Sequence, residues 1–346
     1  MNKKPHILFF KLFLILMPLL LLIIYYIIAD PFKVIYSYDT YYNEKNREMF
    51  MNRDHVSTRL YLSNYPKYRY DSFILGSSRS FGFTTKEWQK YIPSPSSPFH
   101  FDAGSESLFG IYTKIRYLCR NDRPMKNCLV ILDSTLIAKT ENEETLNQIK
   151  NPEVSGESCI KYQYKFLSSF LTGGFFVPYI AWKAANIDKG IFDFIGIIRG
   201  WYYTVDYSTN DVDYTEQEKL ISENSENYYV KMGAFIEKDT VNERNFPVLI
   251  KDKQLKLLHE MKNSFDKCGT SYKIVLCPDF NGVKFHESDY KNLQDIFGKE
   301  NVFDFSGLNE ISKHKEYYID PNHMRIIASN KMLQVIYGQT KQEVIK

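Results

Sequence analysis

The sequence predicts an α/β fold in which a five-stranded parallel sheet lies between layers of helices. Short apolar runs recur along the chain, and each is bounded by turn-forming residues. The runs are too short for helices, which need about ten residues or more, and their continuous apolar character is typical of buried parallel strands. Segments with helical spacing separate the runs, and such alternation implies right-handed crossovers between parallel strands.

The first predicted strand is Asp71 to Leu75, an apolar run that stops at Gly76-Ser77-Ser78-Arg79. In open parallel sheets, functional sites collect just beyond the carboxyl ends of the strands. Ser78 is therefore placed where a nucleophile could act. A simple turn is the alternative, because a serine hydroxyl alone is a poor nucleophile near neutral pH.

The following elements continue the alternation. Thr84-x-x-Glu87 is a capping-box pattern that predicts the start of a helix. Apolar residues at helical spacing predict two more helices, from Leu108 to Leu118 and from Leu255 to Phe265. The remaining strands are expected at 99–102, 128–133, 272–278 and 301–305.

A carboxylate and an imidazole stand three residues apart near the C-terminus, in Asp320-Pro321-Asn322-His323, before an apolar, helix-like run. A serine nucleophile needs a base within hydrogen-bonding reach and a third group that orients the base. This spacing lets one loop supply both groups. We therefore predict Ser78 as nucleophile, His323 as general base and acid, and Asp320 as the orienting carboxylate.

Gly76-Ser77-Ser78 and Asp320-x-x-His323 together resemble the motifs of the SGNH, or GDSL-like, superfamily of hydrolases and acyltransferases. The Gly-Ser-Ser variant with a membrane anchor is similar to the D-alanyl-lipoteichoic-acid transfer proteins and to polysaccharide O-acetylation proteins. The resemblance runs from about Asp71 to Ile336 and rests on the order and separation of two short motifs. It implies a flavodoxin-like strand order, with Ser78 rather than Ser77 as the nucleophile.

The resemblance also implies where an oxyanion would be stabilised, by the backbone N–H groups of Ser78 and Gly104. The family's third block supplies an asparagine, but Leu132-Asp133-Ser134 stands there in this chain. Asp133 would repel an oxyanion, and a missing donor costs roughly a hundred- to a thousandfold in rate. Candidate auxiliary residues near the site are Arg79, Ser134 and Arg325.

The apolar run from Leu12 to Ala29 is long enough to span a bilayer at about 1.5 Å per residue. Lys3, Lys4 and Lys11 precede it and Asp30 follows, which favours a cytoplasmic N-terminus and a translocated main domain. A cleaved signal peptide is the alternative, but no small-x-small cleavage site follows the run. We expect a single-pass protein of the cytoplasmic membrane, with its catalytic domain on the extracytoplasmic (periplasmic or extracellular) side.

Three parts are expected: a cytoplasmic tail and anchor over residues 1–30, a membrane-proximal connector over 31–70, and an SGNH-like domain over 71–346. Residues at about 137–247 break the alternation and predict a helical insertion. Its apolar stretch from Tyr162 to Ala184 carries lysines, which argues against a second membrane span. A lid, a docking face for a protein or a membrane surface, and ordinary core packing all stay open for it.

The charges nearly balance, with 44 Lys and Arg against 41 Asp and Glu, so nothing predicts the basic stripe of a nucleic-acid-binding protein. We expect no cofactor and no metal, because the sequence has no Gly-rich phosphate loop and no His-x-x-x-His pair. The five cysteines show no Cys-x-x-Cys spacing. Most are expected to be small buried residues, and a Cys268–Cys277 disulfide is left open.

These expectations combine into a membrane-anchored, extracytoplasmic serine esterase or O-acyltransferase that acts on acyl esters of a cell-envelope glycan through an acyl-enzyme. Its expected partners are that glycan, or another acyl-carrying substrate, and, by the resemblance, a multi-span membrane O-acyltransferase. The alternative is a non-catalytic envelope protein of the same fold that binds a partner or a glycan. The missing asparagine favours this alternative, and the joint presence of Ser78, Asp320 and His323 argues against it.

Overall fold

A computed structural model describes residues 4–42, 48–49, 51–121, 123–185, 198–199, 204–235 and 244–338. The chain forms two compact units, which we call the anchor unit (Met1–Met51 with Glu157–Trp201) and the α/β unit (Asn52–Gly156 with Tyr202–Lys346). Lys3 and the parts of the predicted insertion at 186–197, 200–203 and 236–243 lie outside the described residues.

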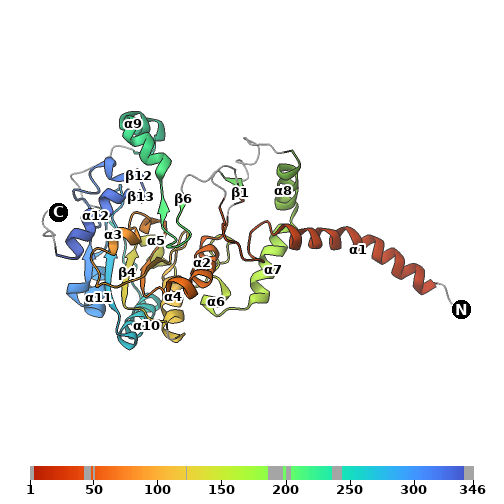
Figure 1. Cartoon of the computed structure of the whole chain (residues 1–346), viewed down its shortest axis with the longest axis horizontal. Coiled ribbons are helices and arrows are strands. Elements are labelled where there is room, and N and C mark those ends of the chain that lie inside the picture. The colour runs from red at the N-terminus through yellow and green to blue at the C-terminus, as the bar shows by residue number, and fades with distance from the viewer. Residues whose placement is uncertain are drawn as a thin grey trace. The chain divides into compact units, whose positions relative to one another are not determined.

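The α/β unit is built on a five-stranded sheet in the order β11-β9-β4-β2-β3. Figure 1 labels its central strand β4. All four pairings between neighbouring strands are parallel. The strands are β2 (Ser72–Leu75), β3 (Pro98–His100), β4 (Asn127–Leu132), β9 (Ser271–Leu276) and β11 (Val302–Asp304). The predicted parallel sheet is confirmed, and its strand order reverses beside β2, where doubly wound sheets bind ligands.

Helices cover both faces of the sheet because each buried strand offers apolar side chains to two sides. On one face, Ile74, Leu129 and Val275 pack with Trp88 of α3 and Met332 of α12. On the other, Phe265 of α10 stacks on Tyr272 of β9 with ring centroids 4.6 Å apart. The helices of this unit are α2 (Arg53–Tyr68), α3 (Thr85–Trp88), α4 (Leu108–Arg120), α5 (Ser134–Ala138), α6 (Pro152–Ser155), α9 (Thr215–Met232), α10 (Asp252–Cys268), α11 (Glu287–Phe297) and α12 (Ile326–Ile336).

Short elements complete the α/β unit. They are η1 (Ser78–Ser80), β6 (Thr204–Val205), β7 (Val212–Asp213), β8 (Arg244–Asn245), β10 (Val283–Lys284), η3 (Lys299–Asn301), η4 (Lys315–Tyr317), β12 (Tyr318–Asp320) and β13 (His323–Met324). The β12–β13 pair is antiparallel, with Asp320 opposite His323. This hairpin therefore brings the two polar residues of the C-terminal motif together.

The unit boundaries differ from the predicted ones at helix α2. The predicted connector over 31–70 is divided at residue 52, because α2 buries Val56, Leu60 and Tyr61 within the α/β unit. The predicted insertion over 137–247 is divided as well. Its segment 157–201 belongs to the anchor unit, whereas the flanking segments belong to the α/β unit.

Buried ion pairs explain how α2 fits the core. Glu106 lies 2.6 Å from the Lys114 ammonium and 2.5 Å from that of Lys150, and Lys114 also pairs with Asp54 of α2 at 3.0 Å. Burial raises the pKa of Glu106, but the two lysines outweigh it and lower the pKa to about 2. The charges thus compensate one another in the interior, as buried charges must.

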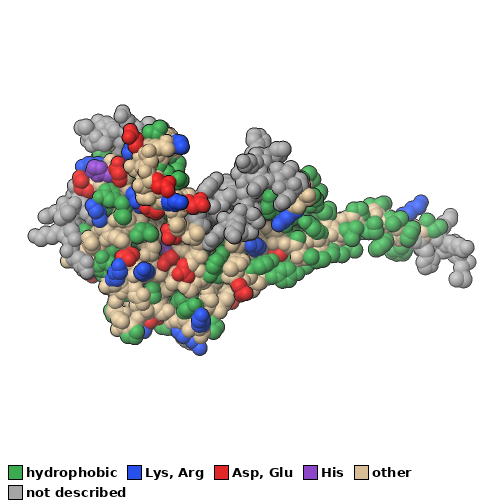
Figure 2. Space-filling view, turned by 45° about the horizontal axis from the view of Figure 1, so that its top comes forward, with side chains coloured by type: hydrophobic (Ala, Val, Ile, Leu, Met, Phe, Trp, Pro, Cys, Tyr) green, Lys and Arg blue, Asp and Glu red, His purple; other side chains and the backbone are tan. Residues whose placement is uncertain are grey.

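The anchor unit contains α1 (Lys4–Ala29), α7 (Cys159–Phe170), α8 (Gly173–Ala185) and an antiparallel pair of β1 (Glu48–Met49) and β5 (Ile198–Arg199). Residues Ile7–Ala29 of α1 are long and apolar enough to cross a membrane. Hydrophobic side chains coat this helix (Figure 2). Aromatic rings join the end of α1 to the following turn, α7 and α8: Tyr25, Tyr26, Phe32, Phe166, Phe170, Phe175 and Tyr179.

The observed disulfide is not the Cys268–Cys277 pair that the sequence left open. Cys119 of α4 and Cys268 of α10 form a disulfide, with their Cα atoms 6.2 Å apart. Cys277 and Cys128 are free and buried in the sheet region, as expected for small apolar residues, and Cys159 is free and exposed. The observed pairing joins residues 149 positions apart, because α4 and α10 pack side by side on the sheet.

Candidate active site

The turn after β2 needs a glycine and then presents Ser78. A Cβ atom on Gly76 would lie 2.8 Å from Cβ of Ser80 and 3.1 Å from the carbonyl oxygen of Ile131, so a larger residue does not fit. The Ser77 hydroxyl accepts a hydrogen bond from Arg79 N at 3.2 Å and caps η1. The tight turn therefore places the Ser78 hydroxyl at the carboxyl edge of the sheet.

Ser78, His323 and Asp320 form a hydrogen-bonded chain. The Ser78 Oγ lies 2.8 Å from Nε2 of His323, and Nδ1 of the same ring lies 2.7 Å from Oδ2 of Asp320. The His323 and Asp320 side chains are 25% and 31% exposed, so the chain lies near the surface. These distances are those that a serine nucleophile, its base and an orienting carboxylate require.

The β12–β13 loop is folded around the Asp320 carboxylate. Its Oδ1 accepts hydrogen bonds from the backbone N–H groups of Asn322 and His323, at 2.8 and 3.1 Å. Burial raises the pKa of Asp320, but the hydrogen bond from His323 and the two backbone bonds outweigh it and hold the pKa below its ordinary value. Asp320 is therefore ionised at neutral pH and can stabilise an imidazolium.

Close packing holds the serine turn against the histidine loop. A Cβ atom on Gly82 would lie 3.2 Å from the carbonyl oxygen of Met324 and would collide with the Ser329 hydroxyl. Tyr214, the residue before α9, lies beside the site, with its ring centroid 6.2 Å from that of His323. Burial, reinforced by the charge of Asp320, raises the pKa of Tyr214, so its hydroxyl stays protonated.

Gly104 follows a segment that runs along β2 toward the serine turn. The chain after β3 continues along β2, since Phe101 N donates to Ile74 O at 2.8 Å and Ala103 N donates to Gly76 O at 3.3 Å. This register brings Gly104 to the level of Ser78. Within the described part of the chain, neither the Ser78 N–H nor the Gly104 N–H donates to another group.

Asp133 does not face the serine hydroxyl that would react. Its Oδ2 accepts a hydrogen bond from the Ser77 hydroxyl at 2.6 Å, and its Oδ1 accepts one from Leu136 N at 2.9 Å and caps α5. The side chain is buried, with 2% exposed. Both oxygens of the Asp133 carboxylate thus accept hydrogen bonds, and the side chain offers no donor to the Ser78 site.

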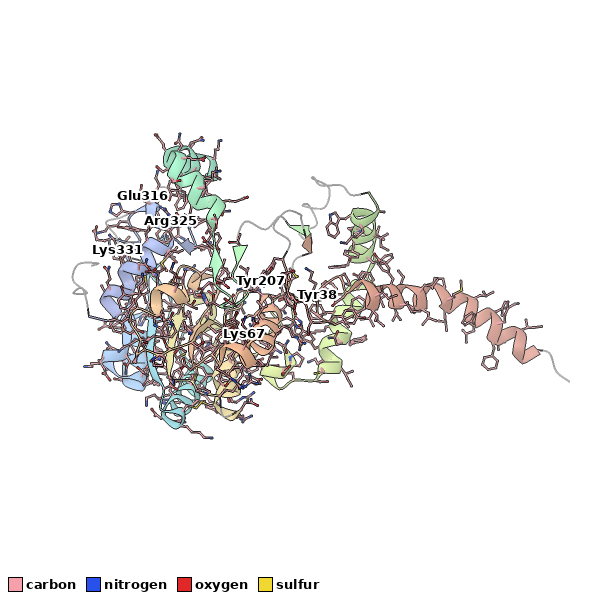
Figure 3. All side chains as sticks on the ribbon, in the orientation of Figure 1. Tyr38, Lys67, Tyr207, Glu316, Arg325 and Lys331 are labelled. Atoms are coloured by element: carbon pink, nitrogen blue, oxygen red, sulfur yellow. A yellow bond between two sulfur atoms is a disulfide. The ribbon has the colours of Figure 1, made fainter. Side chains whose placement is uncertain are left out.

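Two of the auxiliary candidates, Arg79 and Arg325, stabilise loops around the site. Arg79 Nη2 donates to Asn322 Oδ1 at 3.1 Å, and its Nη1 lies 3.6 Å from Asp279 Oδ2. Arg325 donates to both carboxylate oxygens of Glu218 on α9, at 2.9 and 2.5 Å, and to the backbone of Glu316 (Figure 3). The third candidate, Ser134, is the half-buried first residue of α5.

No family model, curated protein or solved structure matches the chain. Its function is therefore inferred from its own residues and their geometry. Across the described ranges, no three His, Cys, Asp or Glu side chains lie close enough together to hold a metal ion.

Sequence reasoning missed a second polar chain beneath the first. The buried Ser80 hydroxyl lies 2.8 Å from Nε2 of His100, whose Nδ1 lies 3.3 Å from Asp211. Ser80 also donates to the carbonyl oxygen of Ser77 at 2.7 Å, so this chain supports the turn that carries Ser78. The only local signal for Ser80 was its place in the Ser77–Ser80 run, and nothing in the sequence linked it to residue 211.

Proposed function

We propose that the protein is a serine-dependent esterase or O-acyltransferase of the SGNH type. The observation that carries the proposal is the Ser78–His323–Asp320 chain, with its 2.8 and 2.7 Å separations. Two groups at one loop and a third at a distant turn meet in the order that nucleophilic catalysis needs. The sheet order and the location of the site at its carboxyl edge support the same assignment.

In the proposed reaction, Ser78 Oγ attacks the carbonyl carbon of an acyl ester while its proton passes to Nε2 of His323. Asp320 stabilises the resulting imidazolium through Nδ1–H. The N–H groups of Ser78 and Gly104 stabilise the negative charge on the carbonyl oxygen. The C–O bond then breaks, the leaving alcohol takes the proton from His323, and acyl-Ser78 remains. Water or an acceptor hydroxyl resolves this intermediate by the reverse proton path.

We propose that the substrate is an acyl ester of a cell-envelope glycan on the extracytoplasmic side of the membrane. The partly exposed His323 and Asp320 suit a substrate too large to be enclosed. The Cys119–Cys268 disulfide supports the extracytoplasmic location, because disulfides persist in oxidising compartments. A multi-span O-acyltransferase in the same membrane is the partner that the family resemblance favours as acyl donor.

A fluorophosphonate probe, which reacts with activated serines, tests the proposal on the full chain in detergent. Wild-type protein should gain one phosphonyl group, which is the mass of the probe minus the HF that leaves, and Ser78→Ala should gain none. Ser63→Ala is the matched control, because Ser63 is an exposed serine on α2 and its loss should leave labelling intact. Equal labelling of wild type and Ser78→Ala would show that the probe reacts with a residue other than Ser78.

The second candidate function is a non-catalytic envelope protein of the same fold. The observation that favours it is Asp133, which stands where the family has an oxyanion donor and is occupied with Ser77 and α5. No labelling of a folded wild-type protein, with intact circular dichroism, would favour this second function over the first.

A further inference from the structure

We propose that helix α8 lies in the boundary of the lipid bilayer beside α1 and gives the protein a second contact with the membrane. The occupant of its exposed face is lipid. The inference does not depend on the proposed chemistry, because it rests on the anchor unit alone.

Helix α8 is almost entirely apolar in composition. Its thirteen residues, Gly173–Ala185, include one charged side chain, Lys183. Two large apolar side chains are exposed, Val177 at 54% and Ile180 at 38%. A helix that is apolar on all sides is normally buried in a core or in lipid. At about 1.5 Å per residue, α8 is also too short to cross a hydrocarbon core of about 30 Å.

Helix α8 contacts α1 near the C-terminal end of the apolar span. Tyr179 of α8 packs on Tyr25 of α1, with ring centroids 6.5 Å apart, and both rings contact Phe170 of α7. Tyr25 belongs to the apolar span Ile7–Ala29 and precedes its end by four residues. At about 1.5 Å rise per residue, Tyr25 lies roughly 6 Å from the end of the span along the axis of α1, and Tyr179 packs on it near that end.

Helix α8 is oriented differently from α1. In Figure 1, α8 runs across the direction of α1 beside its C-terminal end. If α1 crosses the bilayer, α8 lies along the membrane surface at the level where apolar chains meet headgroups. Interfacial helices bury their apolar side chains about 5–10 Å deep at this boundary.

Helix α8 carries a lysine and aromatic side chains close together. The Lys183 ammonium lies over the Trp182 ring, 4.4 Å from its centroid. Trp, Tyr and Lys are the residues that anchor segments at membrane–water interfaces. Gln163 of α7 donates to the carbonyl oxygen of Val34 at 2.9 Å, which ties the helical segment to the turn that follows α1. Both α8 and α1, which belong to the same unit, thus carry exposed large apolar side chains, Val177 and Ile180 on α8 and Ile24, Ile27 and Ile28 on α1.

Fluorescence quenching in nanodiscs tests the location of α8 in the full chain. The chain has three tryptophans, so Trp201→Phe leaves Trp182 and Trp88, the latter buried in the α/β unit. We compare this variant with the double variant Trp182→Phe, Trp201→Phe. Lipids brominated near the headgroup should quench the first protein more strongly than lipids brominated at the chain end. Both lipids should leave the second protein nearly unquenched.

Two further variants separate lipid contact from other causes. In the Trp201→Phe background, Val177→Glu with Ile180→Glu should lower the shallow quenching on the order of twofold, because carboxylates leave the apolar boundary. Ile160→Glu is the matched control, since Ile160 is 83% exposed at the start of α7, and it should change nothing. Stronger quenching by the deep bromines would overturn the proposal. So would quenching of Trp182 by aqueous iodide alone, which would leave the face of α8 open to a protein partner instead.

Discussion

A single carboxylate, that of Asp320, organises the candidate site at the scale of residues. One of its oxygens holds the imidazole of His323, and the other holds two backbone N–H groups of the same loop. The loop conformation and the ring orientation therefore depend on the same side chain. Because its pKa is held below the ordinary value, the carboxylate is ionised at neutral pH and keeps both roles there.

Asp320→Asn should abolish most activity while leaving the fold intact. An amide can still accept the loop's backbone bonds, but its NH₂ group would face Nδ1 and favour the wrong tautomer of His323. We expect the rate of acyl-enzyme formation to fall on the order of 10³- to 10⁴-fold. Stopped-flow measurement of the burst with an activated acetyl ester gives this rate. A decrease of only a few-fold would mean that Asp320 does not orient the base.

His55 on α2 should make the stability of the protein depend on pH. Burial, with a contribution from the charge of Arg59, lowers the pKa of His55 from 6.5 to about 3. Its Nδ1 lies 3.0 Å from the amide nitrogen of Asn151, which donates only to a neutral ring. Below about pH 6.5, His55 binds a proton in the unfolded chain but stays neutral in the folded chain. The contribution of His55 to the unfolding free energy is therefore fully present above this pH and is lost as the pH falls toward about 3.

Between pH 7 and pH 5 the loss should amount to about 2 kcal/mol. His55→Gln keeps an acceptor for Asn151 but does not titrate, so its unfolding free energy should vary less over the same interval. Chemical denaturation of both proteins at the two pH values provides the comparison. Parallel pH profiles for the wild type and the variant would show that another group titrates in this window.

At the scale of elements, α9 braces the loop that carries the base. The hydroxyls of Tyr228 and Tyr229 donate to the carbonyl oxygens of Ile319 and Tyr318, at 2.9 and 3.0 Å. Glu218 binds Arg325 at the start of α12. The helix thus contacts β12 along its length and reaches the residue after β13. Helix α9 belongs to the predicted insertion, for which a lid was one of the alternatives. These hydrogen bonds indicate that α9 supports the β12–β13 loop.

Glu218→Gln should therefore slow acyl-enzyme formation without altering the reacting groups. A displacement of about 1 Å in a catalytic group can cost on the order of a hundredfold, and we expect about tenfold for this partial loosening. The apparent substrate affinity should change little. Lys219→Gln is the control on the same helix, because Lys219 is 73% exposed and pairs weakly with Glu223. If both variants react at the wild-type rate, α9 does not position the loop.

The strands and the three residues of the hydrogen-bonded chain could be predicted because each has a local signal. A buried parallel strand is a continuous apolar run, and Asp320-x-x-His323 shows its pairing by spacing alone. Helix α2 could not be assigned to the α/β unit, because its buried Arg53 meets Asp102, a partner 49 positions away, at 2.8 Å. The position of Tyr214 over His323 and the Cys119–Cys268 pairing likewise depend on distant residues.

At the scale of the whole molecule, the exposed Cys159 reports the side of the membrane on which the chain lies. It is free and exposed at the start of α7, whereas Cys128 and Cys277 are buried. A membrane-impermeant maleimide should label intact cells at this residue, and Cys159→Ser should remove the label. Labelling that requires permeabilised cells would place the domain in the cytoplasm and contradict the proposed location.

The chain passes between its two units three times, at residues 51–52, 156–157 and 201–202. A protein joined to its anchor by one linker can be shed by one protease cut. Here a cut at any one crossing leaves the α/β unit held, either through another crossing or through the aromatic rings of segment 157–201 that pack on α1. We therefore expect that a single cut at one of these crossings leaves the α/β unit attached to α1.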